Sequence, residues 1–139
     1  MESPTYRLDI EQESAQFDLN KHELSTAFVH EKISRVAQMY PNRIAISYLQ
    51  NEYTYKELEV RSNRMAHFLI KEGVRPETKV GICLEPGLSL AISILAVLKA
   101  GGAYIPLMPS LPAHRVQTIL DDADARLFIV NAKQTMHLS

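Results

Sequence analysis

Apolar residues follow two alternating patterns along most of this chain, one helical and one typical of strands. Runs of about 11–18 residues carry apolar positions every three or four residues, which predicts amphipathic helices. Short runs rich in β-branched residues separate them and predict strands. Helices are predicted up to Tyr40, from Tyr55 to Gly73, from Leu88 to Ala100 and from Pro112 to Ala123. Strands are predicted over Ile44–Leu49, Tyr53–Tyr55, Lys79–Leu84, Ala103–Leu107 and Leu127–Val130.

The ends of the first two helices are marked by residues with known capping roles. Ser25 or Thr26 is expected to cap the first helix, on one face of which lie Val29, Ile33, Val36, Ala37 and Tyr40, and Pro41 ends it. Thr54 and Glu57 have the spacing of a capping box, which predicts a helix start at Tyr55. Gln50–Glu52 is the predicted turn before it.

The stretch from Leu88 to Leu107 is the expected centre of the fold. Its helix is apolar on every side, and such a helix is expected to be buried all round. Gly101 and Gly102 separate this helix from the next strand, at the place where a helix end needs a residue free to adopt positive φ.

After one β-β step, strands alternate with helices, which predicts right-handed β-α-β crossovers. The predicted fold is α/β, a mostly parallel sheet with helices on both faces. Residues 1–24 are polar and are interpreted as a leader or linker that docks through Phe17 and Leu19, and residues 25–139 as the folded part. The last strand, Leu127–Val130, is expected to be an exposed apolar edge.

Composition and charge narrow the classes of function. The chain has 139 residues, 46% of them apolar and 22% charged, which is typical of a globular protein with one sizeable core. A net charge of −1 gives no reason to expect nucleic acid or an anionic membrane as a partner. The apolar run Leu88–Leu98 is too short to span a bilayer and no signal peptide is recognised, so a cytoplasmic location is expected. The single cysteine, Cys83, is interpreted as a buried hydrophobic residue rather than a nucleophile.

No group of residues has the spacing of a catalytic or metal site. Gly101 and Gly102 follow a helix, and Gly87 stands alone beside Pro86, so neither predicts a phosphate-binding loop. Glu85 ends a strand where α/β folds bind ligands, although a structural salt bridge is the favoured interpretation. The five histidines are scattered and interpreted as surface or cap residues: His22, His30, His67, His114 and His137. The acidic residues Asp121, Asp122 and Asp124 are interpreted as a solvated turn rather than a cation site.

Two short segments resemble known motifs. YTYKEL (Tyr53–Leu58) and LKAGGAYIPL (Leu98–Leu107) resemble the first two core motifs of the adenylation domains of nonribosomal peptide synthetases, within the acyl-CoA synthetase and luciferase superfamily. The resemblance runs from about Thr26 to Val130, and LKAGGAYIP points to amino-acid-activating members. The motif residues are Tyr53, Thr54, Tyr55, Glu57, Leu58, Leu98, Lys99, Ala100, Gly101, Gly102, Ala103, Tyr104 and Pro106.

Two positions depart from the family pattern, and both suit a diverged copy. Met108 stands where the family mostly has Asp, ahead of a Pro-x-x-Pro-x-x-Arg run retained as Pro109, Pro112 and Arg115. Loss of that Asp is expected to loosen the corner. Pro86 and Gly87 replace a pair that is usually basic or polar.

The resemblance implies an activity whose working parts lie elsewhere in the family sequence. Such enzymes use ATP, with Mg, to turn a carboxylic acid into an acyl-adenylate, then pass the acyl group to a carrier-protein phosphopantetheine thiol. Their phosphate loop, adenine and ribose motifs and lid lysine all follow the segment matched here. The matched part is scaffold in that family, so no catalytic, cofactor-binding or metal-binding residue is assigned to this chain. The implied partners are the remainder of an adenylation domain and a peptidyl carrier protein.

Three hypotheses follow. In the first, the chain is the N-terminal scaffold portion of an amino-acid-activating adenylation domain and is inactive alone. In the second, it is a stand-alone remnant or split-domain partner that binds another protein. The third, a flavodoxin-like nucleotide binder, lacks the glycine-rich strand-to-helix turn that it needs. Under the first hypothesis, exposed apolar faces are expected to cause self-association.

Overall fold

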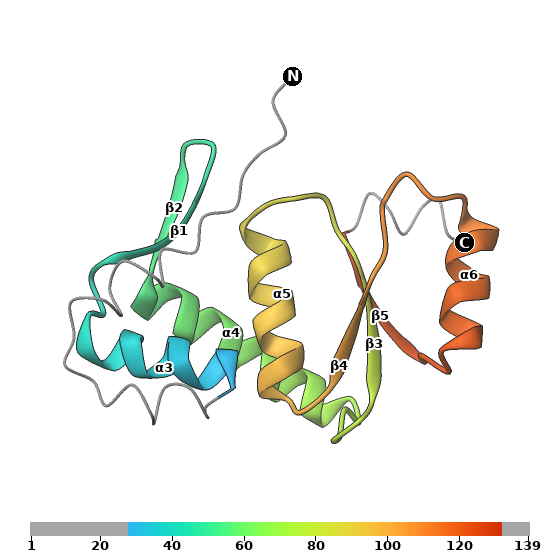
Figure 1. Ribbon diagram of the computed structural model, residues 1–139, viewed down its shortest axis with the longest axis horizontal. Helices are drawn as coiled ribbons and strands as arrows, with labels where there is room; N and C mark the ends of the chain where they lie inside the picture. The colour runs from blue at the N-terminus through green and yellow to red at the C-terminus, as the bar shows by residue number, and fades with distance from the viewer. Residues whose placement is uncertain (1–27, 132–139) are drawn as a thin grey trace. The chain divides into compact units, whose positions relative to one another are not determined.

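The computed structural model describes residues 28–131 (Figure 1). The chain divides into two compact units, with the boundary between Arg61 and Ser62. The boundary falls inside the helix α4 (Tyr55–Lys71). The predicted division into residues 1–24 and 25–139 stays a prediction, and the expected docking of Phe17 and Leu19 lies outside the described residues.

From residue 28 on, the first unit contains one complete helix, a hairpin and the start of α4. Helix α3 covers Val29–Met39, and strands β1 (Ile44–Tyr48) and β2 (Asn51–Thr54) pair antiparallel. Pro41 follows α3 as predicted, and the Lys56 amide donates to the Pro41 carbonyl at 3.0 Å. The buried apolar residues come from all of these elements except β2: Ile33, Val36, Ala37, Ala45, Ile46, Tyr55 and Leu58.

Three local predictions in the first unit are wrong. Phe28, and not Ser25 or Thr26, is the N-cap of α3, where the Phe28 amide donates to the Glu31 carboxylate at 3.2 Å. The hairpin turn lies at Leu49 and Gln50, because Leu49 adopts a φ of 56° and Tyr48 pairs directly with Asn51. Residues 51 and 52, predicted as turn, are therefore part of strand β2. Val29, predicted on the buried face of α3, is exposed at the first helical position.

Helix α4 begins as its sequence predicts. The Glu57 amide donates to Thr54 Oγ1 at 3.2 Å, and the Thr54 amide donates to Glu57 Oε2 at 2.9 Å. These reciprocal bonds satisfy two amides that a helix start would otherwise leave without partners. The predicted inner residues of α4 are buried or half-buried, and Arg61, Arg64 and Lys71 are exposed.

The second unit is a three-stranded parallel sheet with helices on both faces. Its elements after α4 are β3 (Lys79–Cys83), α5 (Leu88–Lys99), β4 (Ala103–Pro106), α6 (Ala113–Asp122) and β5 (Leu127–Val130). The strand order is β4-β3-β5, with Val80 opposite both Tyr104 and Leu127. The predicted α/β class is confirmed, and β3 is central and buried as expected.

Each face of this sheet has its own apolar core. Residues of β3, α5 and the end of α4 form the larger core: Ala66, Leu69, Val74, Val80, Ile82, Leu84, Ala96, Val97 and Ala100. On the opposite face, Val116 and Leu120 of α6 pack with Cys83 and Leu107.

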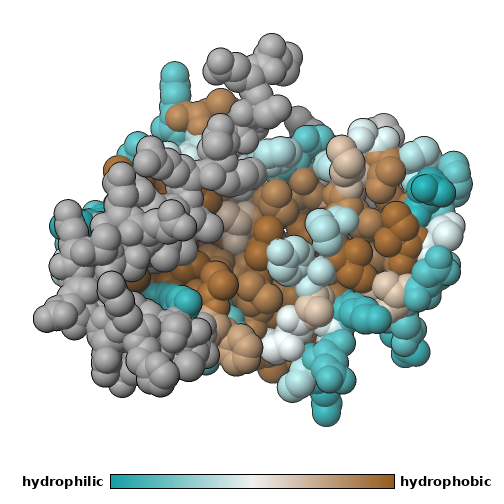
Figure 2. Space-filling model, viewed as in Figure 1, coloured by the Kyte–Doolittle hydropathy of each residue, from teal (hydrophilic) through white to brown (hydrophobic). Residues whose placement is uncertain are grey.

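Helix α5 is less enclosed than predicted, because Leu90, Ile92 and Ile94 are only half-buried while Leu95, Ala96 and Val97 are buried. Figure 2 shows the resulting apolar surface over α5. Within residues 28–131, no helix combines the length and the apolar character needed to cross a membrane.

Candidate functional site

The LKAGGAYIP motif shapes the connection between α5 and β4. Gly101 has a φ of 86°, and its amide donates to the Leu98 carbonyl at 3.0 Å, while the Gly102 amide donates to the Val97 carbonyl at 3.0 Å. These bonds close the helix in the usual glycine-dependent manner. A Cβ on Gly102 would lie 2.9 Å from the Thr78 carbonyl oxygen, closer than side chains are found. The two glycines are therefore needed for different reasons, one for its φ and the other for close packing.

The remaining motif residues also have structural contacts. Lys99 Nζ donates to Asn63 Oδ1 of α4 at 2.8 Å, and the Ala103 amide donates to the Thr78 carbonyl at 2.8 Å. In the other motif, the Arg61 guanidinium lies 4.6 Å from the centre of the Tyr53 ring. Tyr55 and Leu58 are fully buried. These motif residues thus contact neighbouring elements or are buried among them.

A pocket of about 530 Å³ lies at the carboxyl ends of β3 and β4. Open parallel sheets commonly bind ligands at the carboxyl ends of their strands. Its lining is apolar apart from the Glu85 carboxylate and the Ser110 hydroxyl: Ile82, Leu84, Glu85, Pro86, Leu90, Pro106, Leu107, Met108, Pro109 and Ser110. Sequence reasoning singled out Glu85 but did not predict the pocket, which depends on β3 and β4 being neighbours.

The chemistry of this pocket does not suit a triphosphate. Glu85 is exposed and would place a negative charge beside the phosphates. Pro86 has no amide hydrogen, and a single glycine, Gly87, follows it with an extended φ of 165°. The lining residues can contact an apolar group, but they do not fit ATP.

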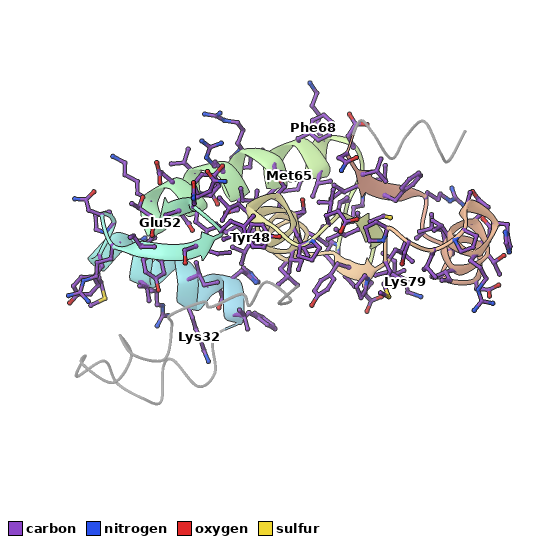
Figure 3. All side chains as sticks on the ribbon, turned by 90° about the horizontal axis from the view of Figure 1, so that it is seen from above. Lys32, Tyr48, Glu52, Met65, Phe68 and Lys79 are labelled. Carbon is purple, nitrogen blue, oxygen red and sulfur yellow. The ribbon has the colours of Figure 1, made fainter. Side chains whose placement is uncertain are left out.

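A second pocket, of about 500 Å³, lies at the amino ends of β3 and β5. Charged residues of both signs line it, including Glu72, Glu77, Lys79 and Arg126. Asp124 also lines it and lies 3.8 Å from Arg126, with both side chains highly exposed. Figure 3 labels Lys79, one of these lining residues. No sequence pattern predicts this pocket, because its residues come from two separate loops, those before β3 and β5, and from the first residues of these strands.

The other candidate residues are dispersed. His30, His67 and His114 lie on three different helices, and among residues 28–131 no three His, Cys, Asp or Glu side chains could jointly hold a metal ion. His22 and His137 lie outside the described residues. Asp121 accepts a hydrogen bond from Gln117 at 2.8 Å, as befits a residue at a helix end. Cys83 is buried, and this burial, followed by the charge of Glu85, raises the pKa of its thiol.

Comparison with known proteins identifies the family. The sequence pattern of the AMP-binding enzymes matches residues 33–139, most of the chain. The chain belongs to the AMP-binding enzyme family. It is 41% identical to the dimodular nonribosomal peptide synthase of Bacillus subtilis over 112 residues, which cover 81% of this chain and 5% of the relative. It is 41% identical to gramicidin S synthase 1 of Brevibacillus brevis over 110 residues, or 79% of this chain and 10% of the relative.

Solved AMP-binding enzymes share the fold. The N-terminal subdomain of NpsA from Klebsiella oxytoca superposes with a TM-score of 0.68 at 27% identity, covering 75% of this chain and 27% of that one. O-succinylbenzoate coenzyme A synthetase (MenE) from Bacillus subtilis, solved in complex with AMP, gives a TM-score of 0.66 at 25% identity. That match covers 76% of this chain and 29% of MenE. The chain thus corresponds to an N-terminal part of an adenylation domain and spans a small fraction of the relatives that it matches.

Proposed function

We propose that this chain supplies the N-terminal scaffold of an amino-acid-activating adenylation domain in nonribosomal peptide synthesis. The observation that carries the proposal is the use of both core motifs for structure: Thr54 and Glu57 cap α4, and Gly101 and Gly102 join α5 to β4. The identity to proteins named as peptide synthases supports the choice of amino acids over other carboxylic acids.

In the proposed reaction, the complete domain first joins an amino acid to the AMP part of ATP. It then transfers the aminoacyl group to a thiol. The carboxylate of an amino acid attacks the α-phosphorus of ATP, which forms aminoacyl-adenylate and releases pyrophosphate. A phosphopantetheine thiol then attacks the acyl carbon, which forms a thioester and releases AMP. We assign the contacts to ATP, Mg and the thiol to residues outside this chain, because the polar motif side chains make structural bonds: Thr54 and Glu57 cap α4, and Lys99 donates to Asn63.

We infer that the 139-residue chain does not form adenylate by itself. The test is ATP–pyrophosphate exchange by the purified chain with a panel of amino acids. The expected rate equals that of a buffer blank for every amino acid. As a positive control, the same assay is run on a chain extended to a complete adenylation domain. Exchange by the short chain clearly above the blank would refute its inactivity.

The proposal implies two partners and a location. The remainder of an adenylation domain completes the fold, and a peptidyl carrier protein receives the acyl group. Both act in the cytoplasm, where ATP and amino acids are available.

A second candidate function is that of a split-domain partner, which binds a separate protein without catalysis of its own. It is favoured by the apolar strand β5, which no other strand of the described residues covers on its outer side. Co-expression with a polypeptide bearing the phosphate loop distinguishes the candidates. A stable complex without exchange activity supports the binding role, whereas a complex that performs exchange supports the scaffold role.

A further inference from the structure

The pocket at the carboxyl ends of β3 and β4 has a backbone held by two hydrogen bonds. The Leu107 amide donates to the Ile82 carbonyl at 2.8 Å, which joins the end of β4 to β3. The Leu111 amide donates to the Met108 carbonyl at 3.0 Å, which closes the turn after β4. The connections from β3 to α5 and from β4 to α6 leave the sheet at this same end (Figure 1). All of the lining residues belong to the second unit, so the pocket is formed within one compact body.

The size and lining of this pocket suit a small apolar group. Its volume of about 530 Å³ lies within the range of about 300–1,000 Å³ that is usual for small-molecule sites. Among its lining residues Ile82, Leu84 and Leu107 are buried, and Leu90 is half-buried. The Met108 side chain also lines it and is 67% exposed. An alkyl chain that covers this apolar surface gains affinity with each methylene group removed from water.

Glu85 sets the charge of the pocket. It is the one charged residue among the described lining residues. Between residues 28 and 131 no ion pair or hydrogen bond engages its carboxylate, so the structural salt bridge favoured from the sequence is not found there. Helix α5 begins close by at Leu88, and a helix N-terminus contributes about half an elementary positive charge. The full negative charge of Glu85 exceeds it, so the pocket favours a cation over an anion.

The lining also includes residues at both positions where the sequence departs from the family pattern. Pro86 precedes α5 and Met108 follows β4, and the pairing of β3 with β4 brings them to one pocket. Each is an apolar residue at a place where the pattern has a polar or charged one. The preference for an apolar ligand therefore concerns this chain and not the family as a whole.

We propose that this pocket binds a primary amine that carries an apolar chain and no carboxylate, with the chain against Leu84, Leu107 and Met108 and the ammonium group beside Glu85. Such an amine is charged at neutral pH, as the lysine side chain is. A carboxylate on the ligand would be repelled by Glu85, so an amino acid binds more weakly than an amine of similar length. The pocket lies in the second unit alone, and its proposed ligand does not depend on the proposed function.

Four probes with six carbon atoms test the ligand class. Hexylamine, hexanol, hexanoate and norleucine share an unbranched apolar chain and differ in the polar groups at one end. Each is titrated into the isotopically labelled 139-residue chain, and NMR shifts of the backbone amides of Glu85, Met108 and Ser110 report binding. Because the probes are small, we expect hexylamine to bind with a dissociation constant on the order of 1 mM.

The order of affinities is the expected result. Hexylamine binds about two- to fivefold more tightly than hexanol, because an exposed ion pair contributes modestly, and hexanoate and norleucine bind more weakly than hexanol. Butylamine, with two methylene groups fewer, binds at least about threefold more weakly than hexylamine. Equal affinities of hexanoate and hexylamine, or of norleucine and hexylamine, would overturn the ligand class. Equal affinities of butylamine and hexylamine, or no saturable shifts at these amides, would overturn the apolar site.

Substitutions of exposed residues separate the charge from the apolar contact. Glu85→Gln is expected to weaken hexylamine about two- to fivefold and to leave hexanol unchanged, whereas Met108→Ala is expected to weaken both by similar factors. Glu72→Gln is the matched control, because it removes an exposed carboxylate from the pocket at the amino ends of the strands. The amide spectrum of each variant checks that it stays folded. If Glu72→Gln weakens hexylamine as much as Glu85→Gln does, general charge attraction explains the binding and the site at Glu85 is wrong.

Discussion

At the scale of single residues, substitutions of the two adjacent glycines of the second motif are expected to destabilise the fold for different physical reasons. Gly101→Ala places a Cβ at a φ of 86° without a close contact, and Gly101→Asn reduces the strain because Asn tolerates this region. Gly102→Ala forces a Cβ to 2.9 Å from the Thr78 carbonyl oxygen. We expect losses in the free energy of unfolding of about 1 kcal/mol for Gly101→Ala and about 1–3 kcal/mol for Gly102→Ala.

Urea unfolding measures both losses. Gly87→Ala is the control, because Gly87 has an extended φ and its Cβ would come no closer than 3.9 Å to the Glu85 carbonyl oxygen. It lacks both the positive φ and the close contact, and its expected loss is below about 1 kcal/mol, the cost of replacing the glycine N-cap of α5 by alanine. If Gly102→Asn lowered the free energy of unfolding no more than Gly101→Asn does, the packing explanation for Gly102 would be wrong.

The buried thiol of Cys83 is expected to make stability fall at alkaline pH. Burial and the nearby Glu85 raise its pKa in the folded chain, so the unfolded chain releases the proton at lower pH. The contribution to stability is therefore complete below the pKa of the unfolded thiol and is lost as pH rises through the higher folded pKa. The difference in unfolding free energy between the unsubstituted chain and Cys83→Ala isolates this effect. A difference that stays constant from pH 7 to alkaline pH contradicts it.

At the scale of elements, the close approach of α6 to the sheet depends on the lack of a side chain at Gly81. A Cβ there would lie 2.6 Å from Leu120 Cδ2 and 3.1 Å from the Phe128 Cβ. We expect Gly81→Ala to cost about 1–3 kcal/mol and Leu120→Ala about 2–5 kcal/mol. The double variant is expected to lose less than their sum, because truncating Leu120 makes room for the new methyl group.

The control for this coupling lies on the other face of the sheet. Leu69 is buried in the core that contains α5, whereas Leu120 belongs to the core that contains α6. Gly81→Ala and Leu69→Ala are therefore expected to add within about 0.5 kcal/mol. Denaturant unfolding of the unsubstituted chain, the three single variants and the two double variants gives both coupling energies. If the free-energy losses of Gly81→Ala and Leu120→Ala were additive, that result would contradict the close contact between these two residues.

The elements show which parts of the fold a sequence can predict. The start of α4 was predictable because Thr54 and Glu57 bond to each other's amides within one turn, a local interaction. The hairpin turn was not, because Leu49 adopts a positive φ that its residue type does not favour. The pocket at Glu85 was also beyond prediction. It requires β3 and β4 to be neighbours, and strand order depends on contacts between distant residues.

At the scale of the whole molecule, the apolar surface of the second unit is expected to cause reversible self-association. Phe68 of α4 is 59% exposed, and Figure 3 shows it on a different side of the helix from Met65, which accepts a hydrogen bond from Ser93 of α5. Such apolar surface on a soluble protein favours association with other chains. The predicted association therefore involves Phe68 and the half-buried residues of α5.

Sedimentation velocity over a range of concentrations tests this prediction. We expect the unsubstituted chain to sediment faster as its concentration rises, and Phe68→Lys to reduce the change because it replaces an exposed ring with a charge. The neighbouring exposed residue supplies the matched control. His67→Lys adds a charge without removing apolar area, so it is expected to leave the association close to that of the unsubstituted chain. If both substitutions reduce association equally, net charge explains the effect, and if the chain stays monomeric throughout, the exposed apolar surface does not drive assembly.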